Sequence, residues 1–220
     1  MELFESIKKD EWVKSLIKRA DNCLEAIGYT EHGFRHTALV SKNAKRILEE
    51  LGFDKKEVEL AAIAGYLHDI GNSVNRVNHP QSGAILAKDI LVKYGMEYDD
   101  ITEIISAIGN HDESFGGEPV NRVSAAVIIA DKGDVHRSRV RNTKQIAFDI
   151  HDRVNYAVMH SNLRVNKEEK IIALELSVDT EISQVMEYFE IFLSRMIISK
   201  KAANFLGCRF KLEINEHILL

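Results

Sequence analysis

Histidine and aspartate side chains stand at the ends of strongly apolar segments of this sequence. His68 and Asp69 close the stretch Leu60–Leu67, which is apolar on every side and should therefore be buried. A buried imidazole and a buried carboxylate cost free energy unless a partner satisfies them. A divalent metal ion is such a partner, because imidazole nitrogen and carboxylate oxygen are good ligands for first-row metals. The pair therefore predicts part of a metal site.

His36 and His32 are expected on one face of a helix over residues 31–51. The residues at helical spacing after His36 are apolar, so this face should point towards the core. A single histidine on an apolar face is more often a hydrogen-bonded core residue than a metal ligand. His36 therefore gains its meaning from the other candidates, and the roles of His32 and Asp112 stay open.

Three further candidates lie at the ends of other apolar segments. Asp131 ends the apolar run 125–130, and His111 ends a stripe of isoleucines spaced by three and four. His79 precedes Pro80, which suits the first position of a helix. The expected ligands of one or two metal ions are therefore His36, His68, Asp69, His79, His111 and Asp131.

The order of these residues resembles the HD-domain superfamily of metal-dependent phosphohydrolases. His36, the pair at 68–69 and Asp131 carry the resemblance. The segment 79–86 is similar to the histidine segment of the HD-GYP branch, and 110–113 falls where that branch has paired histidines. Similar histidines also occur in di-iron HD enzymes that cleave dinucleoside polyphosphates. The resemblance covers roughly residues 28–140.

The match to the HD-GYP branch is incomplete. Asp112 stands where that branch has a second adjacent histidine, and no Gly-Tyr-Pro follows. Asn72 replaces the lysine that is common after the HD pair. His32 replaces a glutamate that some members carry one turn before the first histidine. The chain is therefore identified as a member of the superfamily and not of that branch.

The resemblance implies a metal-dependent phosphohydrolase that cleaves a phosphoester of a nucleotide or a related small phosphorylated molecule, and the ligand set suits this activity. Asp69 has two carboxylate oxygens and would bridge two ions, the second of which His79 and His111 would hold. Such ions would generate a hydroxide nucleophile from water and neutralise a phosphoryl oxygen. Iron or manganese is favoured, and zinc, cobalt, nickel or magnesium also suits these ligands.

Cations follow directly after Asp131 and could bind the phosphate of a substrate. Residues 132–144 contain five lysines and arginines. Lys132 and Arg137 are predicted to stabilise the leaving group and, with Asp69, form the expected catalytic set. A solvated basic loop is the alternative interpretation.

Two other functions fit the same residues. Some HD-fold enzymes use much the same six ligands to activate dioxygen on polyols or phosphonates, which makes a di-iron oxygenase an alternative. A non-catalytic metal or nucleotide sensor is the third hypothesis. Oxygen consumption with iron would identify the oxygenase, whereas tight binding of a phosphoester without turnover would identify the sensor.

Composition favours a compact intracellular enzyme. The chain has 220 residues, enough for one full core, with 45% hydrophobic and 29% charged residues. The net charge of -5 argues against a general nucleic-acid binder, so no stable nucleic-acid complex is expected. Two cysteines are too few for a disulfide framework. Neither a membrane span nor a leader is apparent, which makes the cytoplasm the expected location.

The elements that must position these residues are mainly helical. The expected helices cover 4–27, 31–51, 55–69, 80–95, 100–111, 121–133 and 144–158, and Asp54 and Asp100 are expected to cap two of them. After about residue 160 the apolar pattern alternates, which predicts strands near 161–166, 172–178 and 208–214 around a helix over 181–205.

The predicted fold is thus an HD-domain helical bundle with a small C-terminal β-β-α-β appendage. The predicted domains are 1–158, the metal-dependent phosphohydrolase domain, and 159–220, a structural or oligomerisation unit, with a regulatory ligand site as the alternative. A homodimer through this unit is a reasonable expectation. The Gly-rich segment 113–118 follows His111 and is either a lid over the site or an ordinary connection.

Overall fold

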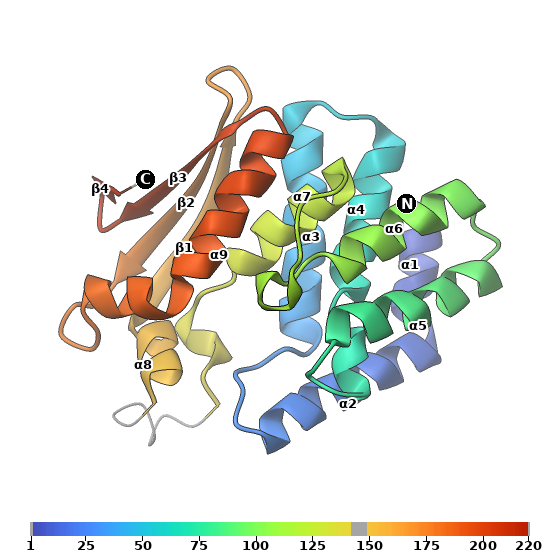
Figure 1. The fold of residues 1–220 in the computed structure, drawn as a ribbon, viewed down its shortest axis with the longest axis horizontal. Helices are drawn as coiled ribbons and strands as arrows, with labels where there is room; N and C mark the ends of the chain where they lie inside the picture. The colour runs from blue at the N-terminus through green and yellow to red at the C-terminus, as the bar shows by residue number, and fades with distance from the viewer. Residues whose placement is uncertain (1, 142–148, 220) are drawn as a thin grey trace.

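The structure, a computed structural model, describes residues 2–141 and 149–219 of the chain. Helices form most of it, and a small sheet with one long helix lies on one side (Figure 1). The helices before the sheet are α1 (Glu2–Lys9), α2 (Glu11–Ala26), α3 (Phe34–Leu51), α4 (Lys55–Leu67), α5 (His79–Lys93), α6 (Tyr98–Gly109), α7 (Arg122–Lys132) and α8 (Ile150–Ala157). Short 3-10 turns connect some of them: η1 (Ile70–Ser73), η2 (Glu113–Phe115) and η3 (Arg137–Arg139). The expected mainly α fold is confirmed.

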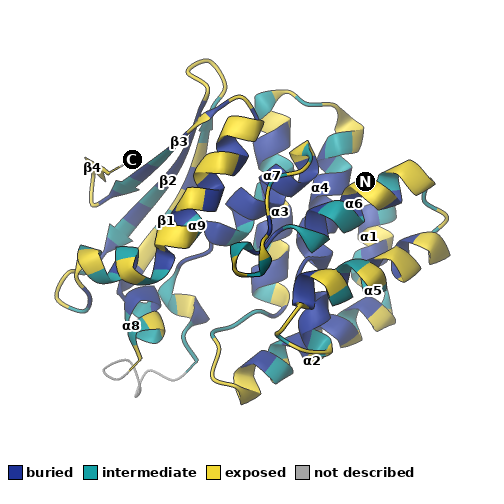
Figure 2. Ribbon diagram, viewed as in Figure 1, coloured by how far each residue is buried: buried dark blue, intermediate teal, exposed yellow. Residues whose placement is uncertain are grey.

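Helix α4 lies at the centre of the helical body, which explains why the pair that follows it is buried. Every residue from Leu60 to Leu67 is buried, and α3, α6 and α7 pack around the helix (Figure 2). Gly65 allows α3 to approach closely, because a Cβ at this position would lie 3.0 Å from the Ser41 Cα. A helix that is apolar on all sides therefore occupies the place that its sequence predicts.

The expected single helix over 4–27 is wrong, because Asp10 interrupts it and separates α1 from α2. This residue has an extended backbone, and its side chain accepts hydrogen bonds from the N–H groups of Trp12 and Val13. An aspartate in that role starts a new helix. Lys93 and Tyr94 also donate to Asp10 Oδ2, at 2.8 and 2.9 Å, so Asp10 connects the start of α2 to the end of α5.

Other helix starts also differ from expectation, and the helix expected over 181–205 begins only at Val185. Helix α3 begins at Phe34 rather than at residue 31, and Gly33 is its N-cap. Helix α6 begins at Tyr98, so Asp100 lies inside the first turn and does not cap it. The Asp54 cap is confirmed, because its side chain accepts from two backbone N–H groups of α4. The part of the expected helix over 144–158 that covers residues 144–148 lies outside the described residues.

The C-terminal part forms a four-stranded sheet and one long helix. The strands are β1 (Val158–Asn166), β2 (Ile171–Val178), β3 (Arg209–Ile214) and β4 (His217–Ile218), and helix α9 (Val185–Phe205) lies between β2 and β3 in the chain. β2 pairs antiparallel with β1 and parallel with β3. A parallel pair needs a long crossover connection, which α9 supplies. The expected β-β-α-β unit is confirmed. Sequence reasoning missed β4, because two residues are too short for an alternating pattern.

The apolar core continues from the helical body into the sheet. Ile128 of α7, Val158 of β1 and Leu174 of β2 belong to the same cluster of buried side chains, and α9 packs against α7. The division into residues 1–158 and 159–220 therefore stays a prediction. Within the described residues no helix is long and apolar enough to cross a membrane.

Candidate metal centre

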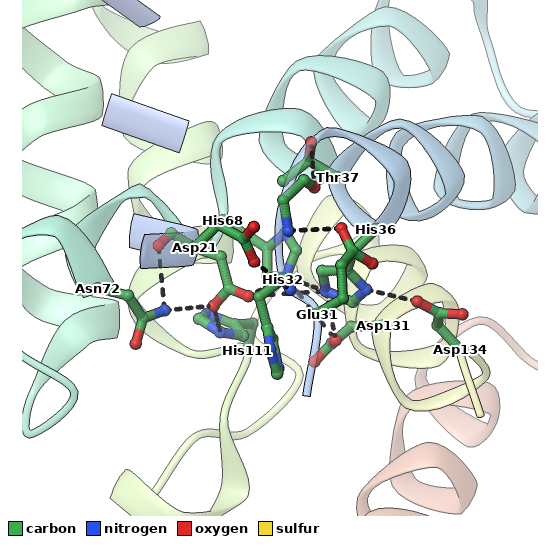
Figure 3. Close-up of polar contacts among 12 residues, drawn as sticks. Asp21, Glu31, His32, His36, Thr37, His68, Asn72, His111, Asp131 and Asp134 are labelled. Carbon is green, nitrogen blue, oxygen red and sulfur yellow. Dashed lines mark hydrogen bonds and ion pairs between the residues drawn. The ribbon is translucent and has the colours of Figure 1, made fainter. Parts of the chain in front are cut away.

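Helix ends from five parts of the chain meet at one buried point beside α4. The first turns of α3 and α5 bring one histidine each, and the ends of α4, α6 and α7 bring the other side chains. The residues that meet there are His36, His68, Asp69, His79, His111 and Asp131. Figure 3 draws His36, His68, His111 and Asp131 among the polar contacts of this cluster. The structure thus brings together all six expected ligands.

His36, His68 and Asp131 form one half of the cluster. The Nε2 atoms of the two histidines are 3.2 Å apart. Asp131 Oδ1 lies 3.3 Å from the Nε2 of His36 and 3.7 Å from that of His68. Donor atoms that bind one first-row ion at about 2.1 Å lie roughly 3 Å from one another. The spacing is therefore that of a ligand set.

His79 and His111 form the other half. Their Nε2 atoms are 3.1 Å apart. Asp69 Oδ1 lies 3.3 Å from the Nε2 of His79 and 3.7 Å from that of His111. Both residues are almost completely buried, at most 1% exposed, so their ring nitrogens need protein or metal partners in place of water.

Asp69 lies between the two halves and presents one oxygen to each. Its Oδ2 atom is 3.6 Å from His36 Nε2 and 3.4 Å from His68 Nε2, whereas Oδ1 faces the other pair of histidines. Asn72 fixes the carboxylate, because its Nδ2 donates to Asp69 Oδ1 at 2.9 Å and to the Asp69 carbonyl at 3.0 Å. This is the geometry of a carboxylate that can bridge two ions.

The Nδ1 atom of each histidine, the nitrogen that does not face the cluster, contacts a hydrogen-bond acceptor. His68 Nδ1 lies 2.9 Å from the Gly65 carbonyl, His79 Nδ1 3.0 Å from the Arg76 carbonyl and His111 Nδ1 2.7 Å from that of Ile108. A carbonyl oxygen only accepts, so each Nδ1 carries the hydrogen. The neutral ring then presents its Nε2 lone pair to the cluster. This is how proteins orient histidine ligands.

His36 is oriented by a carboxylate instead of a carbonyl. Its Nδ1 lies 2.6 Å from Asp134 Oδ2, a contact that Figure 3 draws as a dashed line. Arg35 donates to both oxygens of the same carboxylate, at 3.2 and 2.8 Å, and Arg139 Nε lies 3.7 Å from Oδ2. Burial alone would raise the pKa of Asp134, but Arg139, His36 and Arg35 lower it.

The donor set fits divalent metal ions. Within each pair of histidines, two Nε2 lone pairs face each other at close to 3 Å, an arrangement that is repulsive unless a cation or a proton lies between them. Imidazole nitrogens and carboxylate oxygens together suit iron, manganese, cobalt, nickel and zinc.

The electrostatics of the cluster also favour positive charge. Burial opposes ionisation of Asp69, yet His68 and the other histidines lower its pKa well below the usual value. Burial likewise opposes ionisation of Asp131, whose pKa is lowered by Lys132 and His36. Burial disfavours the charged form of His68, but Asp69 and Asp131 raise its pKa to about 9. The ionised carboxylates thus attract cations, whether protons or metal ions.

Lys132 lies beside the cluster, where the sequence places it. Its Nζ is 2.9 Å from Asp131 Oδ2 and 3.0 Å from Glu113 Oε2, and the side chain is buried. Burial would lower the pKa of this ammonium group, but Asp131, Glu113 and Asp112 raise it. Lys132 therefore stays charged in the wall of the polar cavity that borders the cluster.

The structure does not bring Arg137 to the cluster. Its guanidinium lies over the ring of Tyr156, 5.0 Å from the centroid, and it is not among the described residues that line the cavity. Arg137 and Arg139 both belong to η3, and it is Arg139 that reaches the cavity. The arginines that line the cavity are Arg76, Arg139 and Arg195. Part of the basic segment, residues 142–144, lies outside the described residues.

His32 and Asp112 line the cavity but have other partners. Arg139 donates to His32 Nε2 at 2.8 Å, and His32 Nδ1 lies 2.6 Å from the Thr30 carbonyl. Both ring nitrogens are thus engaged, and burial followed by the Arg139 charge lowers the pKa of His32 well below its usual value. Asp112 pairs with Arg76 at 3.1 Å, and its Oδ2 is 3.7 Å from His79 Nε2. Neither belongs to the groups with metal-ligand spacing.

Sequence reasoning missed Asp134, Arg76 and Arg195 as members of the site. Asp134 stands three residues after Asp131, on a turn whose shape the sequence does not reveal. Arg76 precedes His79 by three residues within a polar loop, so helical spacing gave no signal. Arg195 lies on α9, in a part of the chain without any clustered ligand residues.

Comparisons with known proteins agree with this geometry. Residues 33–154 match the family described as HD domain, which is more than half of the chain. The chain belongs to the HD domain family. An uncharacterized protein of Methanocaldococcus jannaschii, MJ1020, is 29% identical over 84% of this chain and 80% of its own length.

More distant relatives share only the HD region. Ribonuclease Y of Mycoplasma mycoides subsp. mycoides is 33% identical over 51% of this chain, and that of Aquifex aeolicus is 34% identical over 46%. The chain spans about a fifth of these proteins, 20% and 16% of their lengths. A crystal structure of a predicted HD superfamily hydrolase from an uncultured Thermotogales bacterium matches 62% of this chain and 75% of that one, with 24% identity and a TM-score of 0.45.

Proposed function

We propose that the protein is a metal-dependent phosphohydrolase that cleaves a phosphoester of a nucleotide or a related small phosphorylated molecule. The observation that carries the proposal is the position of Asp69, whose two oxygens face two separate pairs of histidines. A site of this kind suits two ions a few ångströms apart, the arrangement used by many phosphatases and nucleases.

Two divalent ions, for which iron or manganese is our first choice, would supply an activated water and a Lewis acid for the phosphoryl oxygen. His36, His68 and Asp131 would hold one ion, and His79 and His111 the other. The chain's own contribution is to hold these ligands rigidly. Each histidine is fixed by its Nδ1 hydrogen bond, which keeps the donor atoms in place.

Cations around the ligand cluster favour a phosphorylated substrate. Lys132, Arg76 and Arg139 line the same polar cavity as Asp69 and His111. In a buried site, positive groups bind phosphate oxygens and stabilise the charge that builds up on them during the transfer. Lys132 lies nearest the ligands and is the residue that we propose for this role.

A larger cavity of about 410 Å³ adjoins the polar one and shares His32, Arg76 and Arg139 with it. Its wall includes the aromatic side chains of Tyr29 and Phe192. A volume of this order suits a small organic ligand. The name ribonuclease Y describes RNA cleavage by relatives of the HD region, which supports phosphoester chemistry on a nucleotide-containing substrate.

The test is a substrate screen with the protein loaded with one defined metal at a time. Nucleoside phosphates, dinucleoside polyphosphates, cyclic nucleotides and a short oligoribonucleotide are incubated with wild-type protein and with Asp69→Asn. We expect release of phosphate or a nucleotide by the wild type and a loss of at least about 100-fold in the variant. Oxygen consumption by the iron-loaded protein without hydrolysis of any phosphoester would overturn the proposal in favour of oxygenase chemistry.

A further inference from the structure

Helix α9 forms part of the wall of the polar cavity that borders the ligand cluster, although it lies outside the residues that match the HD domain family. Arg195 of this helix lines the polar cavity together with Asp69 and His111. It also lines the larger cavity, next to Phe192 and Ser194. A purely structural role for the C-terminal unit does not account for this placement.

Polar contacts hold α9 against the segment 113–118. Ser194 Oγ donates to Glu113 Oε1 at 3.2 Å, and Glu113 Oε2 in turn faces Lys132 Nζ. About two turns further along α9, Lys201 forms an ion pair with Glu118. The expected lid is thus tied to the C-terminal helix at both ends. These contacts fix the position of Arg195 relative to the metal cluster.

Arg195 differs from the other cations of the cavity. Arg76, Lys132 and Arg139 each lie within 4 Å of an aspartate side chain. Among residues 2–141 and 149–219, no hydrogen bond or ion pair occupies the Arg195 guanidinium, which lies over the Phe192 ring with its Cζ 4.5 Å from the centroid. Such stacking orients the planar group and leaves its N–H donors free for an anion.

The lining of the larger cavity indicates which way a ligand would lie. Asp149 and Asp152 line only this cavity, whereas the arginines line both. An anionic group therefore finds favourable charge beside the arginines, which also line the cavity at the ligand cluster, and unfavourable charge beside Asp149 and Asp152. The uncharged part of the ligand would occupy the space beside Tyr29 and Phe192.

We propose that Arg195 is a substrate-binding residue that donates hydrogen bonds to a phosphate oxygen at the metal site, so that the C-terminal unit completes the site built by the HD domain. The proposal rests on the proposed function, since it takes the bound anion to be the phosphate group of the substrate. It also implies that the HD region alone lacks one of the groups that grip the substrate.

The experiment measures binding of inorganic phosphate to the full-length, metal-loaded protein by isothermal titration calorimetry. Arg195→Gln removes the charge but keeps most of the side-chain length, and Lys200→Gln removes an exposed charge from the same helix as a matched control. A lost charged hydrogen bond should raise the dissociation constant for phosphate about tenfold in Arg195→Gln. Lys200→Gln should leave it unchanged, and both variants should keep the wild-type metal content and melting temperature.

Wild-type phosphate affinity in Arg195→Gln would overturn the inference, and so would absence of phosphate binding by the wild-type protein. A loss of affinity that follows a loss of bound metal would also overturn it, because Arg195 would then act through the fold. A different result would refute the proposed function. Phosphate binding that depends on Arg195, without hydrolysis of any phosphoester, would leave this site standing and refute the hydrolase.

Discussion

At the scale of single residues, the cluster depends on what holds the back of each histidine. Three rings are fixed by backbone carbonyls three residues earlier in the chain, and only His36 depends on a distant side chain, Asp134. That carboxylate also neutralises Arg35 and the buried Arg139. Asp134 therefore links the orientation of a ligand to the stability of the fold.

Asp134→Asn tests this link. The amide oxygen can still accept from His36 Nδ1, but the negative charge that faces two arginines is lost. We expect metal affinity to fall by about tenfold. The free energy of unfolding should fall by about 3 kcal/mol, because Arg139 is left as a buried charge with a weaker partner.

Competition with a chelator and urea unfolding measure the two effects. Asp89→Asn is the control, since Asp89 pairs with Lys88 on the exposed surface of α5 and should cost less than about 0.5 kcal/mol. Metal affinity that stays at the wild-type value in Asp134→Asn would show that this carboxylate does not support the ligand.

At the scale of elements, helix ends and tight turns decide where the ligands meet. η1 follows the His68–Asp69 pair directly and packs against the start of α5, which carries His79. At Gly71 a Cβ would lie 2.0 Å from the His79 carbonyl oxygen and 2.5 Å from the Gly83 nitrogen. The distance between the two halves of the site is therefore set by a close backbone contact.

Gly71→Ala should push α5 away from η1 and separate His79 from Asp69. We expect bound metal to fall from two ions towards one per chain, with a loss of stability of about 1–3 kcal/mol. Gly109→Ala is the matched control, because the nearest atom to its added Cβ is 4.0 Å away. Elemental analysis of the two variants gives the ratio, and an unchanged metal content in Gly71→Ala would contradict this account of the spacing.

The break between α1 and α2 gives a prediction about pH. Lys93, and then the bonds from Tyr94 and the α2 backbone, lower the pKa of Asp10 from 3.8 to about 2 against the smaller effect of burial. A folded-state pKa below the unfolded one means that ionised Asp10 stabilises the fold above about pH 4. This stabilisation disappears as the pH falls from 3.8 to about 2.

Asp10→Ala should therefore lower the free energy of unfolding by about 1 kcal/mol at pH 7, through loss of the helix cap. The difference between variant and wild type should shrink as the pH falls below 4. Urea unfolding at a series of pH values measures it. A difference that is constant down to pH 2 would mean that the Asp10 charge does not act on stability.

At the scale of the whole molecule, the C-terminal unit is part of the core and of the site. α9 packs on α7, and Arg195 reaches the cavity beside the ligands. A fragment of residues 1–158 would expose the apolar side of α7 to water. We expect it to lack the cooperative unfolding transition of the full chain, measured by circular dichroism in urea. A fragment with a full-chain transition would show that the predicted boundary separates two independent folding units.

Sequence periodicity predicted the helices and strands well because their apolar faces are regular, as in α4 and β2. It predicted His68, Asp69, His111 and Asp131 because each of them ends an apolar segment, and His36 and His79 because they stand where helices with apolar faces begin. Contacts that depend on loops could not be predicted. Asp134 and Arg76 reach the site through turns without a repeating pattern, and Arg195 does so only because α9 packs across the chain onto α7.

The most direct test of the account is anomalous X-ray diffraction from crystals of the full-length protein loaded with iron or manganese. We predict two anomalous peaks per chain, one bonded to each oxygen of Asp69, with His36 and His68 at the first and His79 and His111 at the second. No peak at this cluster, or a metal that Asp69 does not contact, would contradict it.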